Sequence, residues 1–196
     1  TQNLPICLFH LEISKEQISN RLLSMEIGIE SGRLRTGRLQ LDEWSLLTEG
    51  IDSLSKLPLH ITDKPISSIQ EMQSICQKIK EESTKKSLGL VILDYVQLLD
   101  YLPISDVSNR EEYLLKLAKS LKRMAEELNV PVIIISQLSK DVEKRRNKRP
   151  MLSDIRDFEP LEVYSDIITM IYRDEYYNPE TEDRGITEII TCKHRN

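Results

Sequence analysis

LVILD, at Leu90–Asp94, is a run of four apolar residues that ends in a carboxylate. A second nearly continuous apolar run, VPVIII, follows at Val130–Ile135. Short runs of this kind, rich in Val, Ile and Leu, are typical of strands buried on both faces of a parallel sheet. We therefore expect strands at Leu88–Leu93 and Val130–Ile135.

Four further segments have the composition of strands, and they are Ile6–Leu11, Leu57–Thr62, Asp166–Tyr172 and Ile186–Thr191. Helical patterns fill the gaps between the first four of the six predicted strands. This alternation predicts an α/β fold with a mostly parallel central sheet and right-handed crossovers, in one domain over residues 1–196. After Ser139, long polar stretches separate the last two strands, which we expect to form hairpin-like additions to the sheet.

Three positions have the pattern of a capping box, in which a Ser is followed three residues later by Gln or Glu. They are Ser14 with Gln17, Ser67 with Gln70, and Ser108 with Glu111. The first predicts a helix at Lys15–Glu26. The third precedes an amphipathic helix whose apolar stripe is Leu114, Leu117, Ala118, Leu121, Met124, Ala125 and Leu128.

The composition is that of a folded globular protein, with 39% hydrophobic and 30% charged residues among 196. No apolar run approaches the ~20 residues of a membrane span, and no signal peptide is visible, so we expect no membrane partner. The three cysteines are too far apart for a metal knuckle or an obvious disulfide set, which favours a reducing compartment. The chain does not begin with Met, and we expect it to be a fragment.

The net charge of −5 argues mildly against a protein that coats nucleic acid, but the charge is unevenly spread. Lys140–Arg149 contains six basic residues, Arg145 and Arg146 among them, against two acidic ones. This run predicts either a solvated loop or a nucleic-acid contact, and the run alone does not separate the two.

Polar residues follow three of the predicted strands, at the carboxyl ends where open α/β sheets bind ligands. Asp94 ends an apolar strand, the arrangement in which a rigid strand aims an acid at the magnesium of a bound nucleotide. Glu12 is a candidate general base for an attacking water, and Gln137 is a candidate contact for a γ-phosphate. In isolation, each of the three is also compatible with a turn or cap residue, and for Glu12 the residue alone favours that structural interpretation.

Lys193 and Arg195 alternate near the end of the chain, so both are expected on one face of a strand or its extension. Two neighbouring cations suit a polyphosphate, as an arginine finger does, or form an ordinary exposed edge. No G-x-x-x-x-G-K-[ST] phosphate-binding loop occurs in the sequence.

Seven segments in order along the chain resemble DnaB-type replicative helicases. They are Phe9–Gln17, Arg33–Gly37, Leu93–Leu98, Ser136–Ser139, Lys148–Asp154, Tyr172–Pro179 and Lys193–Asn196. The resemblance implies a RecA-like three-layer fold that is only partial, because the family's phosphate-binding loop and N-terminal domain are absent. RecA-like recombinases share the arrangement of the ATPase core but lack this set of sequence segments.

The resemblance also implies roles for individual residues. Glu12 looks like the base that activates water, Asp94 like the acid that supports Mg²⁺, and Gln137 like the γ-phosphate sensor. Lys193 and Arg195 look like fingers that one subunit inserts into its neighbour's ATP site.

DNA contacts are implied at Arg156 and Asp157, with Arg145 and Arg146 as further candidates. In that stretch the family usually continues with an acid and a Ser-Gly pair, whereas this chain has Asp157-Phe158-Glu159-Pro160. The missing glycine, and a Pro without a backbone N–H, argue against direct contacts from the backbone of this loop to DNA.

For the whole protein, the resemblance implies an ATP- and Mg²⁺-dependent homohexameric ring that moves 5′ to 3′ on single-stranded DNA and unwinds the replication fork. Primase and a helicase loader are the expected partners, and the bacterial cytoplasm or the plastid stroma is the expected location. The fragment alone is expected to be inactive. Two alternatives stay open: a RecA-like recombinase-type ATPase, and a non-catalytic ring or scaffold subunit.

Overall fold

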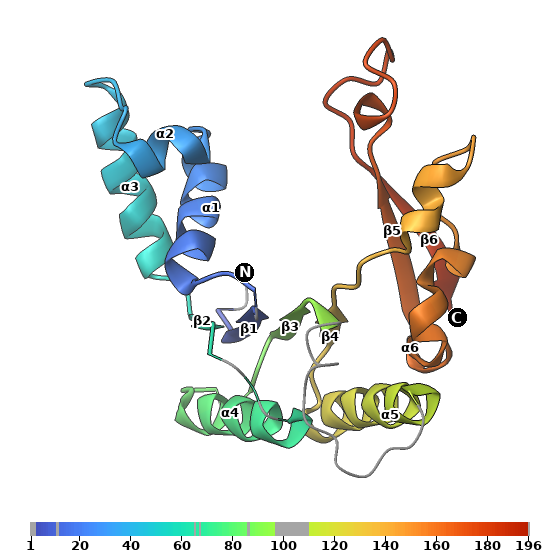
Figure 1. Cartoon of the computed structure of the whole chain (residues 1–196). Coiled ribbons are helices and arrows are strands. Elements are labelled where there is room, and N and C mark those ends of the chain that lie inside the picture. The colour runs from blue at the N-terminus through green and yellow to red at the C-terminus, as the bar shows by residue number, and fades with distance from the viewer. Residues whose placement is uncertain are drawn as a thin grey trace. The chain divides into compact units, whose positions relative to one another are not determined.

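The computed structural model of the chain describes residues 3–10, 12–64, 66, 68–85, 87–96 and 110–195, with the backbone alone at 110–111 and 156–159. The chain divides into two compact units, coloured along the sequence in Figure 1. The first unit is Thr1–Leu102 with Ala125–Ile135, and the second is Pro103–Met124 with Ser136–Asn196. That the two units form one domain stays a prediction.

The first unit contains a four-stranded sheet in the order β2-β1-β3-β4, in which all neighbouring strands run parallel. Its strands are β1 (Ile6–His10), β2 (Leu59–Thr62), β3 (Leu90–Asp94) and β4 (Val132–Ile134). The predicted α/β class and parallel sheet are therefore confirmed. β2, β3 and β4 each begin two residues later than predicted, and β3 includes Asp94 itself.

Four helices of this unit are α1 (Lys15–Ile27), α2 (Ser31–Thr36), α3 (Glu43–Ser55) and α4 (Ile69–Glu82). The predicted capping box begins α1, with Ser14 and Gln17 bonded reciprocally. The predicted cap of α4 was wrong by one residue. Ser68, not Ser67, is the N-cap, because its hydroxyl accepts the backbone N–H of Glu71.

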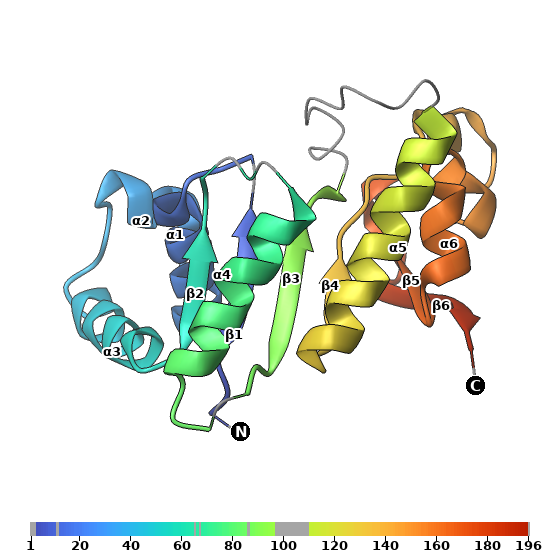
Figure 2. The same ribbon diagram turned by 90° about the horizontal axis from the view of Figure 1, so that it is seen from below.

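α4 lies along one face of the sheet, as Figure 2 shows from below. The residues of the first unit that are almost fully buried include Cys7 and Phe9 of β1, Val91 and Leu93 of β3, and Met72 and Cys76 of α4. Alternate residues of β3 are buried and the others are only partly covered, whereas the apolar run predicted burial on both faces. In the same unit, α1 packs against both α2 and α3.

Gly50 sets the close approach of α3 to α1. A Cβ atom at this position would lie 2.4 Å from Ile27 Cγ2 and 2.9 Å from Leu23 Cδ1, both in α1. Because no side chain fits there, glycine lets the two helices meet.

The second unit is built around the antiparallel pair β5 (Ile167–Tyr172) and β6 (Glu188–His194), which forms a sheet of its own. This confirms the predicted hairpin-like pairing, but the expectation that these strands add to the parallel sheet is wrong, because among the described residues β5 and β6 pair with each other. Short helices precede and follow β5: the 3₁₀ helices η2 (Lys140–Lys144), η3 (Leu152–Phe158) and η4 (Asp174–Tyr176), and α6 (Glu159–Tyr164).

The helix α5 (Arg110–Leu128) contributes residues 110–124 to the second unit and 125–128 to the first. Six of the seven residues in its predicted apolar stripe are buried, and Ala125 is half-buried. The predicted cap at Ser108 and Glu111 lies outside the described residues and side chains. No helix in the described part of the chain is both long enough and apolar enough to cross a membrane.

Candidate active site

The carboxyl ends of β1 and β3 meet at one edge of the parallel sheet. The two strands are hydrogen-bonded neighbours, and His10 is the register partner of Asp94. This pairing places the two residues that end the strands side by side. It also brings the chain that follows β1, with Glu12 in it, to the edge where ligands of open α/β sheets bind.

Asp94 is the final residue of β3, and its side chain is 28% exposed. One carboxylate oxygen, Oδ2, lies 3.0 Å from Nε2 of His10. The peptide bond from Asp94 to Tyr95 is cis. The acid is therefore held by one strong contact and still reaches solvent, as a ligand for a cation requires.

Mg²⁺ fits a site of this kind, because it is commonly bound by one or two carboxylates together with substrate phosphates and water. Across the described residues there is no cluster of three or more His, Cys, Asp or Glu side chains that could hold a metal alone. A single carboxylate at a strand end matches a cation that arrives with a nucleotide.

Glu12 lies in the two-residue bend between β1 and the capping residue of α1, and it is exposed. Its backbone N–H donates to Nδ1 of His10 at 3.3 Å. Both sides of the bend are fixed, by the strand on one side and by the Ser14 capping box on the other. The Glu12 carboxylate is thus anchored through its backbone while its side chain faces solvent.

Gln137 follows β4 by three residues and is exposed. It belongs to the second unit, whereas Asp94 and Glu12 belong to the first. Its meeting with Asp94 at one nucleotide stays a prediction.

Lys193 and Arg195 lie at the end of β6, and each contacts a group near the start of β5. Lys193 Nζ donates to the backbone carbonyl of Glu162 in α6 at 2.5 Å. Arg195 Nη1 lies 3.0 Å from Oδ1 of Asp166, whose other oxygen lies 2.7 Å from Lys122 Nζ. Both cations hold the pKa of Asp166 below its ordinary value, Lys122 more strongly than Arg195.

The basic run Lys140–Arg149 is largely engaged within the second unit. Arg145 makes a two-pronged ion pair with Asp154, at 2.9 and 2.8 Å. Arg149 does the same with Glu188, at 2.6 Å for both prongs, and its guanidinium lies 4.7 Å above the ring of Tyr172.

Arg146 differs from its neighbour Arg145. It is exposed, and within the described part of the chain no acidic side chain forms an ion pair with it. Of the two predicted DNA contacts in this run, Arg146 is the one with a free guanidinium, whereas Arg145 is occupied by Asp154.

The predicted DNA loop at Arg156 and Asp157 has helical backbone. Residues 152–158 form η3, which is kinked by non-helical backbone at Ile155. The helix α6 begins at Glu159 with Pro160 in its first turn, where a missing N–H costs little. The side chains of Arg156 and Asp157 lie outside the described atoms, so their DNA contacts stay predictions.

Sequence reasoning missed three residues that organise these sites: His10, Asp154 and Asp166. Asp154 is 6% exposed and accepts from both Arg145 and the backbone N–H of Met151. A carboxylate in the first turn of a short helix gives no sign in the sequence that it is buried. His10 lies in a mostly apolar strand, and its partner Asp94 can be identified only from the register of β1 with β3.

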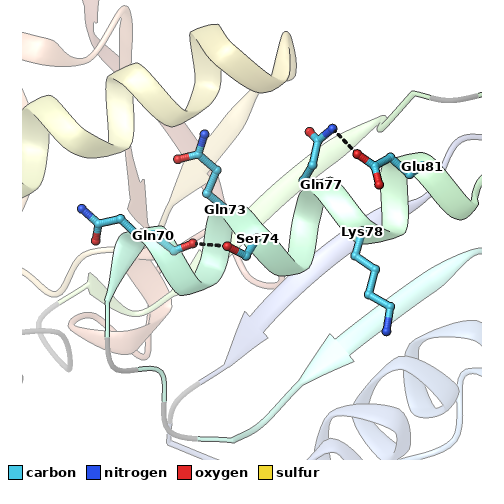
Figure 3. A pocket seen from close by; sticks show the side chains of 6 residues that line it. All are labelled: Gln70, Gln73, Ser74, Gln77, Lys78 and Glu81. Atoms are coloured by element: carbon cyan, nitrogen blue, oxygen red, sulfur yellow. Dashed lines mark hydrogen bonds between the residues drawn. The ribbon is translucent and has the colours of Figure 1, made fainter.

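One shallow depression lies on α4, away from these residues. Figure 3 shows its lining of Gln70, Gln73, Ser74, Gln77, Lys78 and Glu81, all from one helix face. Gln77 donates to Glu81 at 2.8 Å along the same face. No predicted site residue lines it, and we interpret it as a solvated surface.

The parallel sheet with helices on its strand connections, and with polar residues at the ends of β1 and β3, defines an α/β protein with a candidate ligand site at one edge of its sheet. The chain belongs to the DnaB-like helicase C-terminal domain family, which matches residues 1–196.

The chain is similar to named helicases along its whole length. It is 41% identical over 194 residues to the replicative DNA helicase DnaB of Geobacillus stearothermophilus, covering 99% of this chain and 42% of that protein. It is 45% identical over 196 residues to a probable replicative DNA helicase of Trieres chinensis, covering 98% of this chain and 42% of that protein. The chain thus spans less than half the length of these relatives.

Solved structures give the same result. A DnaB-like replicative helicase, described together with its interactions with primase, superposes with a TM-score of 0.92 at 35% identity, over 99% of this chain and 46% of that one. A solved ATPase domain superposes with a TM-score of 0.91 at 35% identity, over 99% of this chain and 68% of that one. These likenesses confirm the predicted RecA-like fold.

Proposed function

We propose that this chain is the ATP-hydrolysing motor of a replicative DNA helicase. The observation that carries the proposal is the edge formed by β1 and β3, where the Asp94 carboxylate and the backbone of Glu12 are held by one buried histidine. Family membership supports the same function, because the relatives are named as replicative DNA helicases.

Each residue has a distinct task in the proposed hydrolysis. Asp94 would hold Mg²⁺, which would supply positive charge next to the phosphates of a bound nucleotide. Glu12 accepts a proton from the attacking water, and its exposed side chain in a fixed bend suits that task. Gln137 contacts the γ-phosphate.

Lys193 and Arg195 complete the site of a neighbouring subunit. Both lie at the end of one strand of the antiparallel pair, and Arg195 is 57% exposed, so its guanidinium is accessible to another molecule. Because a finger of this kind acts on the neighbour's nucleotide, the proposal includes a homohexameric ring.

Single-stranded DNA is the proposed substrate of the ring, with movement 5′ to 3′. Arg146 is the best-supported contact because it is exposed and unpaired among the described residues. Arg145, Arg156 and Asp157 stay as further proposed contacts. Primase and a helicase loader are the proposed partners, and primase is named with one solved relative. The cytoplasm of a bacterium or the plastid stroma is the proposed location.

A fork-unwinding assay on the full-length protein tests this proposal. Forks with only a 5′ single-stranded tail on the translocation strand should be unwound with ATP and Mg²⁺, and forks with only a 3′ tail should not. ATP hydrolysis stimulated by DNA without any unwinding would favour the recombinase-type ATPase. Absence of hydrolysis from an assembled ring would favour the scaffold.

A further inference from the structure

His10 is a buried polar residue at the proposed active site that takes no chemical step in the proposed hydrolysis. It is the last residue of β1, and its side chain is 8% exposed. Among the described residues, His10 and Asp154 are the buried polar or charged ones. A buried imidazole is costly unless its nitrogen atoms are hydrogen-bonded, so its partners indicate why the position tolerates it.

Both ring nitrogens of His10 have partners at the proposed active site. Nδ1 accepts the backbone N–H groups of Glu12 and Ile13, each at 3.3 Å. Because Nδ1 accepts, it carries no hydrogen, and the ring proton is on Nε2. Nε2 lies 3.0 Å from Oδ2 of Asp94 and donates to it.

The imidazole therefore joins two strands at the point where each delivers a functional carboxylate. One side of the ring holds the Asp94 side chain, and the other holds the backbone from which the Glu12 side chain extends. The ring is rigid, and His10 is the register partner of Asp94 in the neighbouring strand, so the ring fixes the distance between these two anchor points.

We propose that His10 is a positioning residue that sets the Glu12 base in register with the cation-binding carboxylate of Asp94. The proposal rests on the proposed function, because it assigns His10 a task in that same site. Hydrogen-bond partners of metal ligands orient those ligands, and their loss typically costs ~10–100-fold in metal affinity or activity.

Two conservative variants separate the two halves of the contact. In His10→Asn, the amide oxygen takes the place of Nδ1 and still accepts from the bend, but the donor to Asp94 is lost. In His10→Gln, the amide nitrogen reaches the place of Nε2 and still donates to Asp94, but the acceptor for the bend is lost. His10→Phe removes both contacts and keeps an aromatic ring, although a larger one, and His60→Gln on the exposed face of β2 is the matched control.

Two measurements on the full-length protein test the contact of His10 with Asp94 and its contact with the Glu12 bend separately. The first is the Mg²⁺ concentration needed for half-maximal equilibrium binding of a slowly hydrolysed ATP analogue. The second is kcat at saturating ATP and Mg²⁺. Thermal midpoints of all variants show how much each substitution affects folding.

We expect His10→Asn to raise the Mg²⁺ requirement about 10–100-fold while kcat stays within a few-fold of wild type. We expect His10→Gln to lower kcat about 10–100-fold while the Mg²⁺ requirement stays near wild type. His10→Phe should show both changes, and His60→Gln neither.

A purely structural histidine gives a different pattern. If the Asn and Gln variants change kcat and the Mg²⁺ requirement together, in proportion to the loss in thermal midpoint, the positioning role is wrong. It is also wrong if neither variant changes either quantity while Glu12→Gln abolishes hydrolysis. If Glu12→Gln itself leaves hydrolysis intact, the proposed function fails, and the positioning role fails with it.

Discussion

The edge of the parallel sheet and the end of the antiparallel pair hold their functional side chains in opposite ways. At the sheet edge, Asp94 and the Glu12 backbone are tied to a histidine that is 6% exposed. At the end of β6, Arg195 and its partner Asp166 are both more than half exposed. Exposed ion pairs contribute little free energy, typically ~0.2–1 kcal/mol, whereas buried hydrogen bonds constrain geometry strongly.

This difference matches the two tasks proposed for them. A base and a cation ligand must keep a fixed separation within one subunit, so a rigid buried contact suits them. A finger must leave its resting partner and reach a nucleotide on another subunit, so a weak exposed pair suits it. The predictions below test this contrast.

Arg195→Ala should have the largest effect on activity. Loss of a finger removes positive charge from the transition state, and steady-state ATP hydrolysis by the full-length protein should fall by about 10³–10⁵-fold. Nucleotide binding by the altered subunit should persist, because its own sheet edge is intact. Arg184→Ala, an exposed arginine between β5 and β6, is the control and should hydrolyse ATP normally.

Glu12→Gln should follow, with hydrolysis lowered by about 10²–10⁴-fold and nucleotide binding retained. The amide keeps the shape of the side chain but cannot accept the proton. Single-turnover hydrolysis and equilibrium nucleotide binding, measured on the same preparation, check the loss of hydrolysis and the retention of binding. Hydrolysis within a few-fold of wild type would exclude Glu12 as the base.

Arg145→Ala and Arg146→Ala should differ, although the two residues are adjacent. Loss of Arg145 leaves Asp154 buried without its ion pair, which should cost on the order of 3 kcal/mol of folding stability. Loss of exposed Arg146 should change stability by less than about 0.5 kcal/mol.

DNA binding should show the reverse order. Arg146→Ala should reduce the salt dependence of single-strand binding by about one unit of slope, which titrations at several salt concentrations measure. If the salt dependence of the assembled Arg146→Ala protein equals that of wild type, Arg146 does not contact DNA and the basic run is a solvated loop.

Asp166→Asn should have the smallest effect, and it should depend on pH. The folded pKa of Asp166 lies below that of an unfolded aspartate, about 3.9, because Lys122 and Arg195 stabilise the carboxylate. The ionised group therefore stabilises the fold above about pH 4, and this contribution disappears as the pH falls through the lowered folded pKa. The thermal midpoint of the variant should be slightly lower than wild type at pH 7 and equal to it well below pH 4. If the thermal midpoints of the variant and wild type still differ well below pH 4, the effect comes from packing and not from the charge of Asp166.

The fold was largely predictable because its signals are local. Apolar runs marked all four parallel strands, and the spacing of Leu114, Leu117 and Leu121 marked the buried stripe of α5. The errors were also local. A strand begins where its hydrogen bonds to a neighbouring strand begin, so its apolar run can start before the strand does. Of two neighbouring serines, only the backbone geometry selects Ser68 as the cap of α4.

The site was only partly predictable, because its contacts depend on register. Strand ends gave Glu12 and Asp94, but the partner that joins them is set by the pairing of β1 with β3, which no local pattern reports. In the same way, the basic run predicted Arg145 and Arg146 as DNA contacts without distinguishing between them. Only the long-range ion pair to Asp154 separates them.

Mixing two inactive variants tests most directly whether the fixed edge and the exposed finger act across subunits. Full-length Arg195→Ala and Glu12→Gln subunits are combined, and ATP hydrolysis is followed as their ratio is varied. In mixed rings one kind of interface pairs an intact Glu12 site with an intact Arg195 finger. We predict that hydrolysis reappears and is greatest near equal proportions. A mixture that stays inactive while mass measurements show mixed hexamers, and while small additions of wild-type subunits restore hydrolysis, would contradict the account.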